Sequence, residues 1–309
     1  MKKGLILPAL IIALASCSDD NNEPLQETSG SGQPSTPDTE LSITVVDYSP
    51  APGQFINEIP EYSEGDTRET INAKATESLN AGDMISLGAW GGSVTLKLSS
   101  PIANIAGKDD FRVKGNAVYA NASTESTRYG SAEPGIILVM QDTNGNGKAD
   151  DTWYEIKGDH TDDATANYTV TYFRPDAGAT DSEYIRWEAS DGTTGYINRN
   201  SSYHTQDFFP MWLNHGESMS FSGKRLPDNG HFNTETNKFD LMSYNGYADS
   251  HPNNVEASGI DISDAIDSNG NTVTLSSIDF IKVYTGVLQA NGPLGECSTE
   301  VAGIEVLNQ

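Results

Sequence analysis

The sequence predicts an all-β protein, a jelly-roll-like β-sandwich with one short helix, preceded by a lipoprotein signal and a disordered tether. Short runs of β-branched and aromatic residues recur along the chain, and clusters of Gly, Asn, Asp and Pro separate them. Such clusters supply the backbone conformations that turns require. A single stretch shows the apolar period of a helix. These patterns favour packed sheets over a helical or mixed fold.

Eight runs carry the strand signal. Each is short enough to be a strand of a globular protein, and each begins or ends next to turn-forming residues. In chain order they are SITVVDY (42–48), SVTLKL (93–98), GIILVMQ (135–141), TWYEIK (152–157), YTVTYF (168–173), YIRWEA (184–189), SMSFSG (218–223) and IDFIKVYTGV (278–287).

The predicted helix lies between Asp66 and Gly82. Asp66 is suited to cap its first turn, and Glu69 would complete a capping box with it. Gly82 is suited to end the helix because glycine tolerates the left-handed backbone of a C-cap. The apolar positions that would share one buried face are Ile71, Ala75 and Leu79.

Residues 1–16 have the features of a lipoprotein signal peptide. A basic pair precedes an apolar run of about ten residues, whereas a membrane-spanning helix needs about 20. The LASC sequence ending at Cys17 resembles a bacterial lipobox, which implies cleavage before Cys17 and a lipid on its thiol. The SDDNNE segment that follows resembles the surface-export signal of Bacteroidetes-type lipoproteins. We therefore expect a surface-exposed outer-membrane protein that meets the membrane only through its lipid anchor.

Residues 17–40 are expected to form a flexible linker. They are rich in Ser, Pro, Gly, Asn, Thr and acidic residues, and they contain few apolar ones. A segment of this composition cannot bury enough surface to fold. Residues 41–309 then form a single β-sandwich ligand-binding domain, since no second linker composition interrupts them.

The chain is strongly acidic, with a formal net charge of −26. Removing Lys2 and Lys3 with the signal leaves 16 of the 18 basic residues against 44 acidic ones, a net charge of −28. Such a surface repels phosphate backbones, which excludes nucleic acid as a partner. Because Cys17 would carry lipid, only Cys297 remains, so core packing rather than a disulfide must stabilise the domain.

The segment QDTNGNGKADD (141–151) matches the spacing of a calcium-binding loop. Counted from Asp142, oxygen-bearing side chains occupy the first, third, fifth and ninth places, and a glycine at the sixth place allows the sharp bend. Trp153 stands at the twelfth place, where an EF-hand needs Glu, so the loop resembles instead the calcium loops that close β-hairpins in integrin-type propeller repeats. A plain hairpin turn is the alternative, because Asn-Gly pairs form turns without an ion. The expected ligands of a structural calcium ion are Asp142, Asn144, Asn146, the carbonyl of Lys148, and Asp150.

Aromatic residues in loops are the main candidates for ligand contact, because flat aromatic faces stack on sugars and other planar ligands. The segment YHTQDFFPMW (203–212) has the densest aromatic run and is poorly suited to a regular strand. A second loop, GYADSHPNN (246–254), combines an aromatic with acid and amide groups. Core filling and turn capping are the alternatives. The candidate ligand-binding residues are Trp90, Tyr203, His204, Phe208, Trp212, Tyr247 and Asp249.

The sequence contains no convincing catalytic motif. It has no G-x-S-x-G, no H-E-x-x-H and no Gly-rich phosphate-binding loop. Acidic residues are so abundant that their presence identifies no glycosidase pair. We therefore expect a binding protein rather than an enzyme.

Several blocks together resemble a family of Bacteroidetes cell-surface lipoproteins, of the kind labelled PKD-type or cell surface proteins. The most specific block is EPGIILVMQDTNGNGKADDTWYEIKG (133–158), and the resemblance covers essentially all of 41–309. Such proteins accompany TonB-dependent outer-membrane transporters in sets that look like corrinoid (cobalamin) uptake systems. The resemblance implies capture of a corrinoid for such a transporter. The other matching blocks are SLGAWGGSVTLKL, DFRVKGNA, YHTQDFFPMW, GYADSHPNN, IDFIKVYTGV and LGECSTEVAGIE.

Two alternatives remain open at this point. A carbohydrate-binding surface lipoprotein of a glycan-uptake system is compatible with the Trp and Tyr residues. A glycoside hydrolase would need two carboxyl groups that face each other across a cleft.

Overall fold

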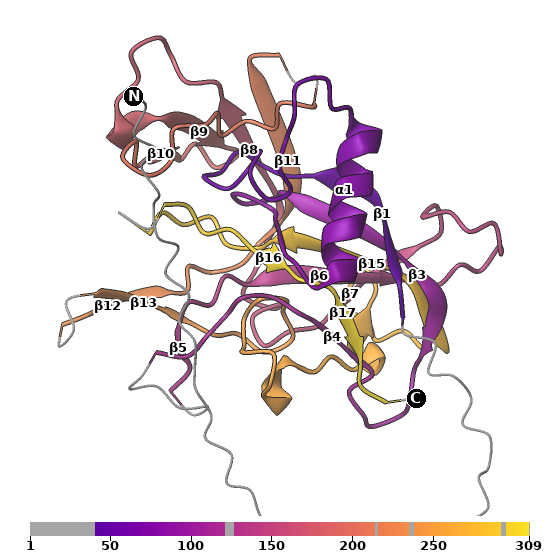
Figure 1. The fold of residues 1–309 in the computed structure, drawn as a ribbon. Helices are drawn as coiled ribbons and strands as arrows, with labels where there is room; N and C mark the ends of the chain where they lie inside the picture. Colours follow the sequence, from indigo (N-terminus) through magenta and orange to yellow (C-terminus); the bar gives the residue numbers. More distant parts are fainter. Residues whose placement is uncertain (1–40, 121–126, 214–215, 235–237, 292–294, 309) are drawn as a thin grey trace, which may run out of the picture. The chain divides into compact units, whose positions relative to one another are not determined.

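The computed structural model describes residues 41–120, 127–213, 216–234, 238–291 and 295–308. The predicted signal peptide (1–16), the lipidation site Cys17 and the linker (17–40) lie outside these residues. The described chain consists mainly of antiparallel strands with one α-helix (Figure 1), so the prediction of an all-β sandwich is confirmed. In these same ranges, no helix combines the length and the apolar character needed to cross a membrane.

The larger sheet has six strands in the order β1-β3-β15-β6-β7-β14, and each neighbouring pair is antiparallel. β15 comes from near the C-terminus, yet it lies between β3 and β6 in the middle of this sheet. Strands far apart in the sequence therefore form its centre. Its strands are β1 (Ile43–Ser49), β3 (Ser93–Ala103), β6 (Gly135–Met140), β7 (Trp153–Ile156), β14 (Ala265–Ile266) and β15 (Ser277–Thr285).

The smaller sheet has four strands in the order β10-β9-β8-β11. They are β8 (Thr165–Phe173), β9 (Ile185–Ala189), β10 (Thr194–Ile197) and β11 (Ser218–Arg225). Three further sheets are short. They are formed by β5 (Tyr129–Gly130) with β12 (Gly230–Asn233) and β13 (Lys238–Met242), by β2 (Ile85–Ser86) with β16 (Glu300–Val301), and by β4 (Phe111–Val113) with β17 (Ile304–Val306).

All eight predicted strands are confirmed, as β1, β3, β6, β7, β8, β9, β11 and β15. The strands that the sequence did not indicate are only two to five residues long. Runs of two to five residues carry too little periodicity to be recognised in the sequence.

The predicted helix is confirmed as α1 (Arg68–Ala81), but its N-cap is not the one expected. Thr67, not Asp66, is the N-cap, and Thr70 rather than Glu69 completes the capping box. Thr67 accepts the N–H of Thr70, and the Thr70 hydroxyl accepts the N–H of Thr67, which satisfies both donors reciprocally. The buried face and the helix end are as predicted, at Ile71, Ala75, Leu79 and Gly82.

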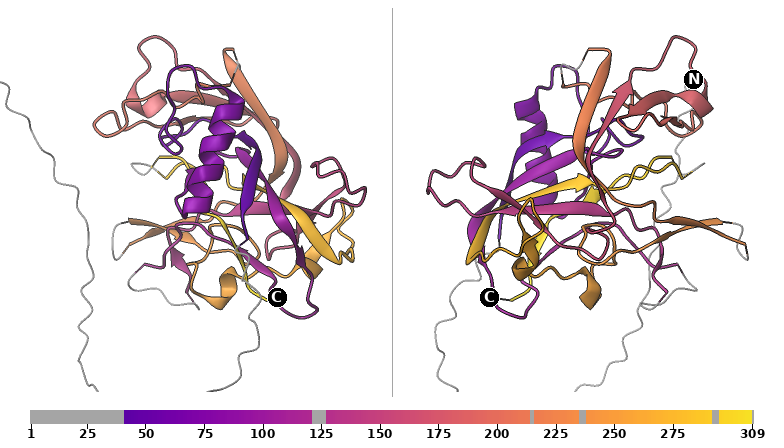
Figure 2. Two further views of the ribbon diagram at one scale, coloured as in Figure 1. Left: turned by 45° about the vertical axis from the view of Figure 1, so that its right-hand side comes forward. Right: turned by 180° about the vertical axis from the view of Figure 1, so that it is seen from behind.

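Helix α1 runs alongside β1 and covers the free edge of the large sheet (Figures 1 and 2). Three helical side chains, spaced by four residues, take the place of a neighbouring strand. Asn72, Thr76 and Asn80 accept the backbone N–H groups of Tyr48, Val45 and Ile43 at 2.9 to 3.1 Å. This side-chain ladder satisfies donors that would otherwise be open to pairing with another chain.

Buried apolar residues form three clusters. The largest combines the apolar face of α1 with alternate residues of the large sheet. The second lies against the small sheet, and the third contains the loop that follows β13. Representative members are Leu79, Leu96 and Val139 in the first, Trp90, Tyr172 and Phe208 in the second, and Tyr244, Tyr247 and Cys297 in the third.

Candidate functional site

A groove of about 540 Å³ lies over the large sheet. Its floor is a row of side chains that crosses three strands, because Lys282 on β15 pairs with Leu138 on β6, which in turn pairs with Glu155 on β7. These residues occupy alternate positions whose neighbours, such as Val139 and Val283, are buried in the core. We refer to this cavity as the sheet groove.

Trp153 and Tyr284 add aromatic surface to the sheet groove, and both are partly exposed. Lys224 on β11 closes one side, where its Nζ lies 2.7 Å from a carboxylate oxygen of Glu155. The backbone N–H of Lys224 also donates to the Tyr284 hydroxyl at 3.2 Å. Apolar rings and charged groups therefore stand side by side in one concave surface, which is the usual make-up of a small-ligand site.

The predicted calcium loop connects β6 to β7, directly beside the groove floor. The Asp142 carboxylate accepts the N–H groups of Asn146 at 3.2 Å and Gly147 at 2.7 Å. The Asn146 side chain accepts the N–H of Lys148 at 2.8 Å and donates to the Asp150 carboxylate at 3.1 Å. The side chains at the first, fifth and ninth places thus point into the loop, as the spacing predicts.

The oxygen-rich interior of this loop fits a hard divalent cation such as calcium. Gly147 has a φ of +70°, which supports the sharp bend at the sixth place. The amide group of Asn144 donates to Asp150 at 3.2 Å, so an ion would require a rotation that presents its oxygen instead. Calcium binding here stays a prediction, with the ligands named from the sequence.

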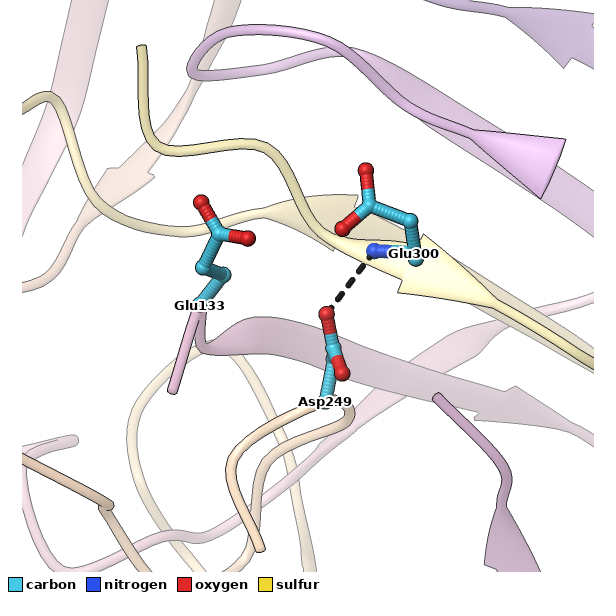
Figure 3. Close-up of side chains that lie close together, drawn as sticks. All are labelled: Glu133, Asp249 and Glu300. Carbon is cyan, nitrogen blue, oxygen red and sulfur yellow. Dashed lines mark hydrogen bonds between the residues drawn. The ribbon is translucent and has the colours of Figure 1, made fainter. Parts of the chain in front are cut away.

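A buried acid cluster is the second arrangement with chemical potential. The carboxyl groups of Glu133, Asp249 and Glu300 approach one another from three separate segments, with oxygens within 4.8 Å of one another (Figure 3). Asp249 is 2% exposed and Glu300 is 4% exposed. Glu133 is partly exposed. Three carboxyl groups this close, two of them buried, must share protons, bind a cation, or both.

Hydrogen bonds hold the acid cluster in place. Asp249 accepts the N–H groups of Asn116, Ala117 and Glu300 at 2.8 to 3.0 Å. The Glu300 carboxylate accepts the hydroxyl groups of two serines, Ser86 and Ser298, at 3.1 and 3.0 Å. Glu133 accepts the N–H of Ser298 at 2.9 Å. The cluster therefore ties together strand β16 and the loops before β6 and after β13.

Burial raises the pKa of each acid in the cluster. The pKa of Asp249 rises to about 7, and burial together with the Asp249 charge raises the pKa of Glu300 to about 8. Burial, followed by repulsion from Glu300, raises the pKa of Glu133 well above its usual range. The neighbouring Glu296 carboxyl is likewise raised to about 7 by burial. At neutral pH the cluster can therefore hold protons, and the binding of a divalent cation would displace them into solvent.

Four of the predicted ligand-binding aromatics are core residues instead. Trp90 and Phe208 have no exposed surface, Tyr247 is 4% exposed and Trp212 is 8% exposed. The Trp212 ring stacks on Tyr48, with ring centroids 5.7 Å apart. The structure corrects the expectation for these four, because an enclosed ring has no free face on which a ligand can stack.

The remaining candidates lie in different surroundings. Tyr203 is 80% exposed, and the ring of its neighbour His204 packs edge-on against Phe55 at 5.2 Å. Asp249 belongs to the buried acid cluster, so the expectation that it faces a ligand from an exposed loop is also corrected. The seven candidates do not converge on one site.

Sequence reasoning missed the residues of the sheet groove. The available signal was the alternation within IDFIKVYTGV, where Lys282 and Tyr284 interrupt the apolar residues. TWYEIK offers a similar signal at Trp153 and Glu155. The order of strands in the sheet, which places these residues side by side, is not visible in either run.

The sequence matches no protein-family model, and no curated protein matches it at a significant level. The family resemblance of the sequence blocks therefore stays a prediction.

Proposed function

We propose that the chain is an outer-membrane surface lipoprotein that captures a small extracellular ligand, best represented by a corrinoid such as cobalamin, for a TonB-dependent transporter. The lipid on Cys17 and the linker 17–40 would keep the domain at the cell surface near that transporter. The chain acts by binding and not by catalysis. The sheet groove is the observation that carries the proposal.

The side chains of the groove are complementary to the surfaces of a corrinoid. A corrin ring has broad faces of low polarity and a rim of amide groups, so it requires flat apolar contacts next to hydrogen-bonding groups. Trp153 and Leu138 supply apolar area, and Lys282 supplies a donor. The volume of about 540 Å³ lies in the range of roughly 300 to 1,000 Å³ that is typical of small-ligand sites, so the groove would hold part of a corrinoid and leave the rest of the molecule outside.

A structural calcium ion in the loop 142–150 belongs to this proposal. The loop joins β6 and β7, which contribute Leu138 and Glu155 to the groove floor. An ion would fix the connection between these strands and supply no chemistry to the ligand. Its contribution would be to stability and to the position of Trp153, the first residue of β7.

Calorimetric titration of the purified mature protein with cyanocobalamin tests the proposal. We expect binding, and we expect Trp153→Ala to weaken it about tenfold or more, since the truncation removes the buried apolar area of the ring as well as an aromatic contact worth roughly 0.5 to 1.5 kcal/mol beyond that area. Tyr203→Ala is the matched control, because Tyr203 is exposed but does not line the groove. The absence of heat and of retained colour at micromolar protein would rule out the corrinoid version.

A further inference from the structure

A row of planar side chains crosses the outer face of the small sheet, away from its core. Tyr196 on β10 pairs directly with Arg186 on β9. The Arg186 guanidinium in turn lies 4.0 Å from the ring centroid of Phe173 on β8. Tyr196 is 38% exposed, and the Arg186 side chain is 43% exposed. The three groups occupy neighbouring strands on one face of the sheet, and the guanidinium covers one face of the Phe173 ring. We call these three side chains the planar row.

A depression of about 420 Å³ adjoins the planar row. Its wall is the segment 174–180, which contains the small residues Ala177, Gly178 and Ala179. Small side chains leave the depression accessible from this side. Glu183 and Glu217 also line it, so carboxylate acceptors stand within the same concave surface as the rings.

The two arginines beside the depression are each paired with a carboxylate, and the depression as a whole is acidic. Arg186 forms an ion pair with Glu188 on its own strand, and Arg174 pairs with Asp207 at 3.0 Å. Glu183 and Glu217 add negative charge to the depression, and the chain as a whole carries a net charge of −26. An anionic ligand would meet repulsion here, whereas a neutral ligand could use both the guanidinium donors and the carboxylate acceptors.

The part of this face that β8 and β11 form is lined with hydroxyl groups. Thr171 bonds to Ser220 at 2.8 Å, and Thr169 bonds to Ser222 at 2.9 Å, across the pairing of β8 with β11. Their positions alternate with buried residues such as Val170, so they share the outer face with Phe173. The planar row is thus continued by a flat, uncharged and polar strip.

We propose that the planar row and its depression form a second binding site, for a neutral oligosaccharide. Sugar rings have weakly polar C–H faces that stack on aromatic rings, and their vicinal hydroxyl groups fit the paired donors of guanidinium and the paired acceptors of carboxylate. Tyr196 supplies the stacking face, the Phe173 ring holds the Arg186 guanidinium in place, and Arg186 and Glu183 supply the polar contacts. The hydroxyl strip allows a chain of several sugars to lie along the sheet.

This site is separate from the sheet groove. Asn167 lines the groove and Phe173 belongs to the planar row, and both lie on β8. Six residues of an extended strand span about 20 Å. Ser222 of the hydroxyl strip also lines the sheet groove, but Tyr196 and Trp153 mark opposite ends of this span, so substitutions at these two residues test the two proposals separately.

Calorimetric titration of the mature protein with neutral hexasaccharides tests the proposal, using maltohexaose, cellohexaose, mannohexaose and xylohexaose as probes. We expect at least one to bind, Tyr196→Ala to weaken that binding about tenfold or more, and Tyr196→Phe to keep it within about threefold, because the ring and not the hydroxyl does the stacking. Trp153→Ala, in the sheet groove, should leave it unchanged.

Ala177→Trp provides a second variant that does not depend on the edge strand tolerating a substitution. Ala177 is exposed on the wall of the depression, so a large ring there should block the sugar without disturbing the core. The proposal is overturned if no hexasaccharide binds at about millimolar concentration. It is equally overturned if binding survives both Tyr196→Ala and Ala177→Trp, or if trigalacturonate binds more tightly than the neutral probes.

Discussion

Replacement of the buried Glu296 by Gln tests how the acid-rich interior responds to pH. Glu296 is 4% exposed, and its Oε1 accepts the N–H of Gln54 at 2.7 Å. Its Oε2 has no hydrogen-bond partner among the described residues. Gln keeps the oxygen that Gln54 needs and replaces the unpartnered oxygen by an amide nitrogen. The substitution therefore removes the ionisation of Glu296 while preserving its main contact.

The sign of the effect follows from the direction of the pKa shift. Burial raises the pKa of Glu296 from 4.5 to about 7, so the fold holds this proton more tightly than the unfolded chain does. The stabilisation is complete below about pH 4.5 and is lost as the pH rises through about 7. At about 1.4 kcal/mol per pH unit, the free energy of unfolding falls by about 3 kcal/mol across this interval. Glu296→Gln avoids this loss.

Thermal unfolding at pH 5 and at pH 9 measures the difference. We expect nearly equal melting temperatures at pH 5, and at pH 9 an advantage for Glu296→Gln of roughly 6 to 12 °C for a domain of this size. Glu183→Gln, an exposed acid, is the matched control and should show no such dependence on pH. An equal difference at both pH values, or a variant less stable than wild type at pH 9, would refute the reasoning.

Three further substitutions address the loop, the core and the helix end. Asp142→Ala should abolish the stabilisation by calcium that we expect for wild type, and a wild-type melting curve indifferent to calcium and EDTA would contradict the calcium prediction. Trp212→Ala should lower the free energy of unfolding by about 3 to 5 kcal/mol, which is the cost of truncating a large core side chain. Its cobalamin affinity should be unchanged, and a folded variant that has lost this affinity would restore Trp212 as a ligand residue. Gly82→Ala should cost about 1 kcal/mol in urea denaturation because Gly82 has a φ of +81°, and an unchanged midpoint would show that the helix end adapts.

Local sequence patterns predicted the strands and the helix because both depend on neighbouring residues. The apolar face of α1 recurs every four residues, and each of the eight strands carries its signal within six to ten residues. The N-cap of α1 is the one local feature of the helix that was predicted wrongly, at Asp66 instead of Thr67. Asp66 and Thr67 are both good capping residues, and the reciprocal bonds between Thr67 and Thr70 decide between them. Such competition between adjacent caps depends on geometry rather than on residue type.

Aromatic density misled the prediction of the ligand site for a physical reason. The run 203–212 lacks the alternation of a strand, so its rings were expected on an exposed loop. In the fold, this irregular segment lies against the core, where Phe208 packs edge-on against Tyr184 with ring centroids 5.0 Å apart. Within this run only Tyr203 keeps an exposed ring, whereas Trp153 and Tyr196 lie on regular strands and are partly exposed because one face of each sheet is open. Irregular sequence therefore did not mean an exposed segment.

The acid cluster could not be predicted, because each of its members has an ordinary appearance in the sequence. Asp249 follows a Gly-Tyr-Ala turn and resembles a solvated loop residue. Its φ of +49° turns the carboxylate inward, where it accepts N–H groups from residues 116 and 117 and from Glu300. A buried carboxylate is costly unless such donors surround it, and unpaired buried N–H groups are costly as well. Hydrogen bonds between the carboxylate and these N–H groups remove both costs, but they form only when the distant segments meet. The cluster is therefore a property of the fold and cannot be recognised in any single stretch of the chain.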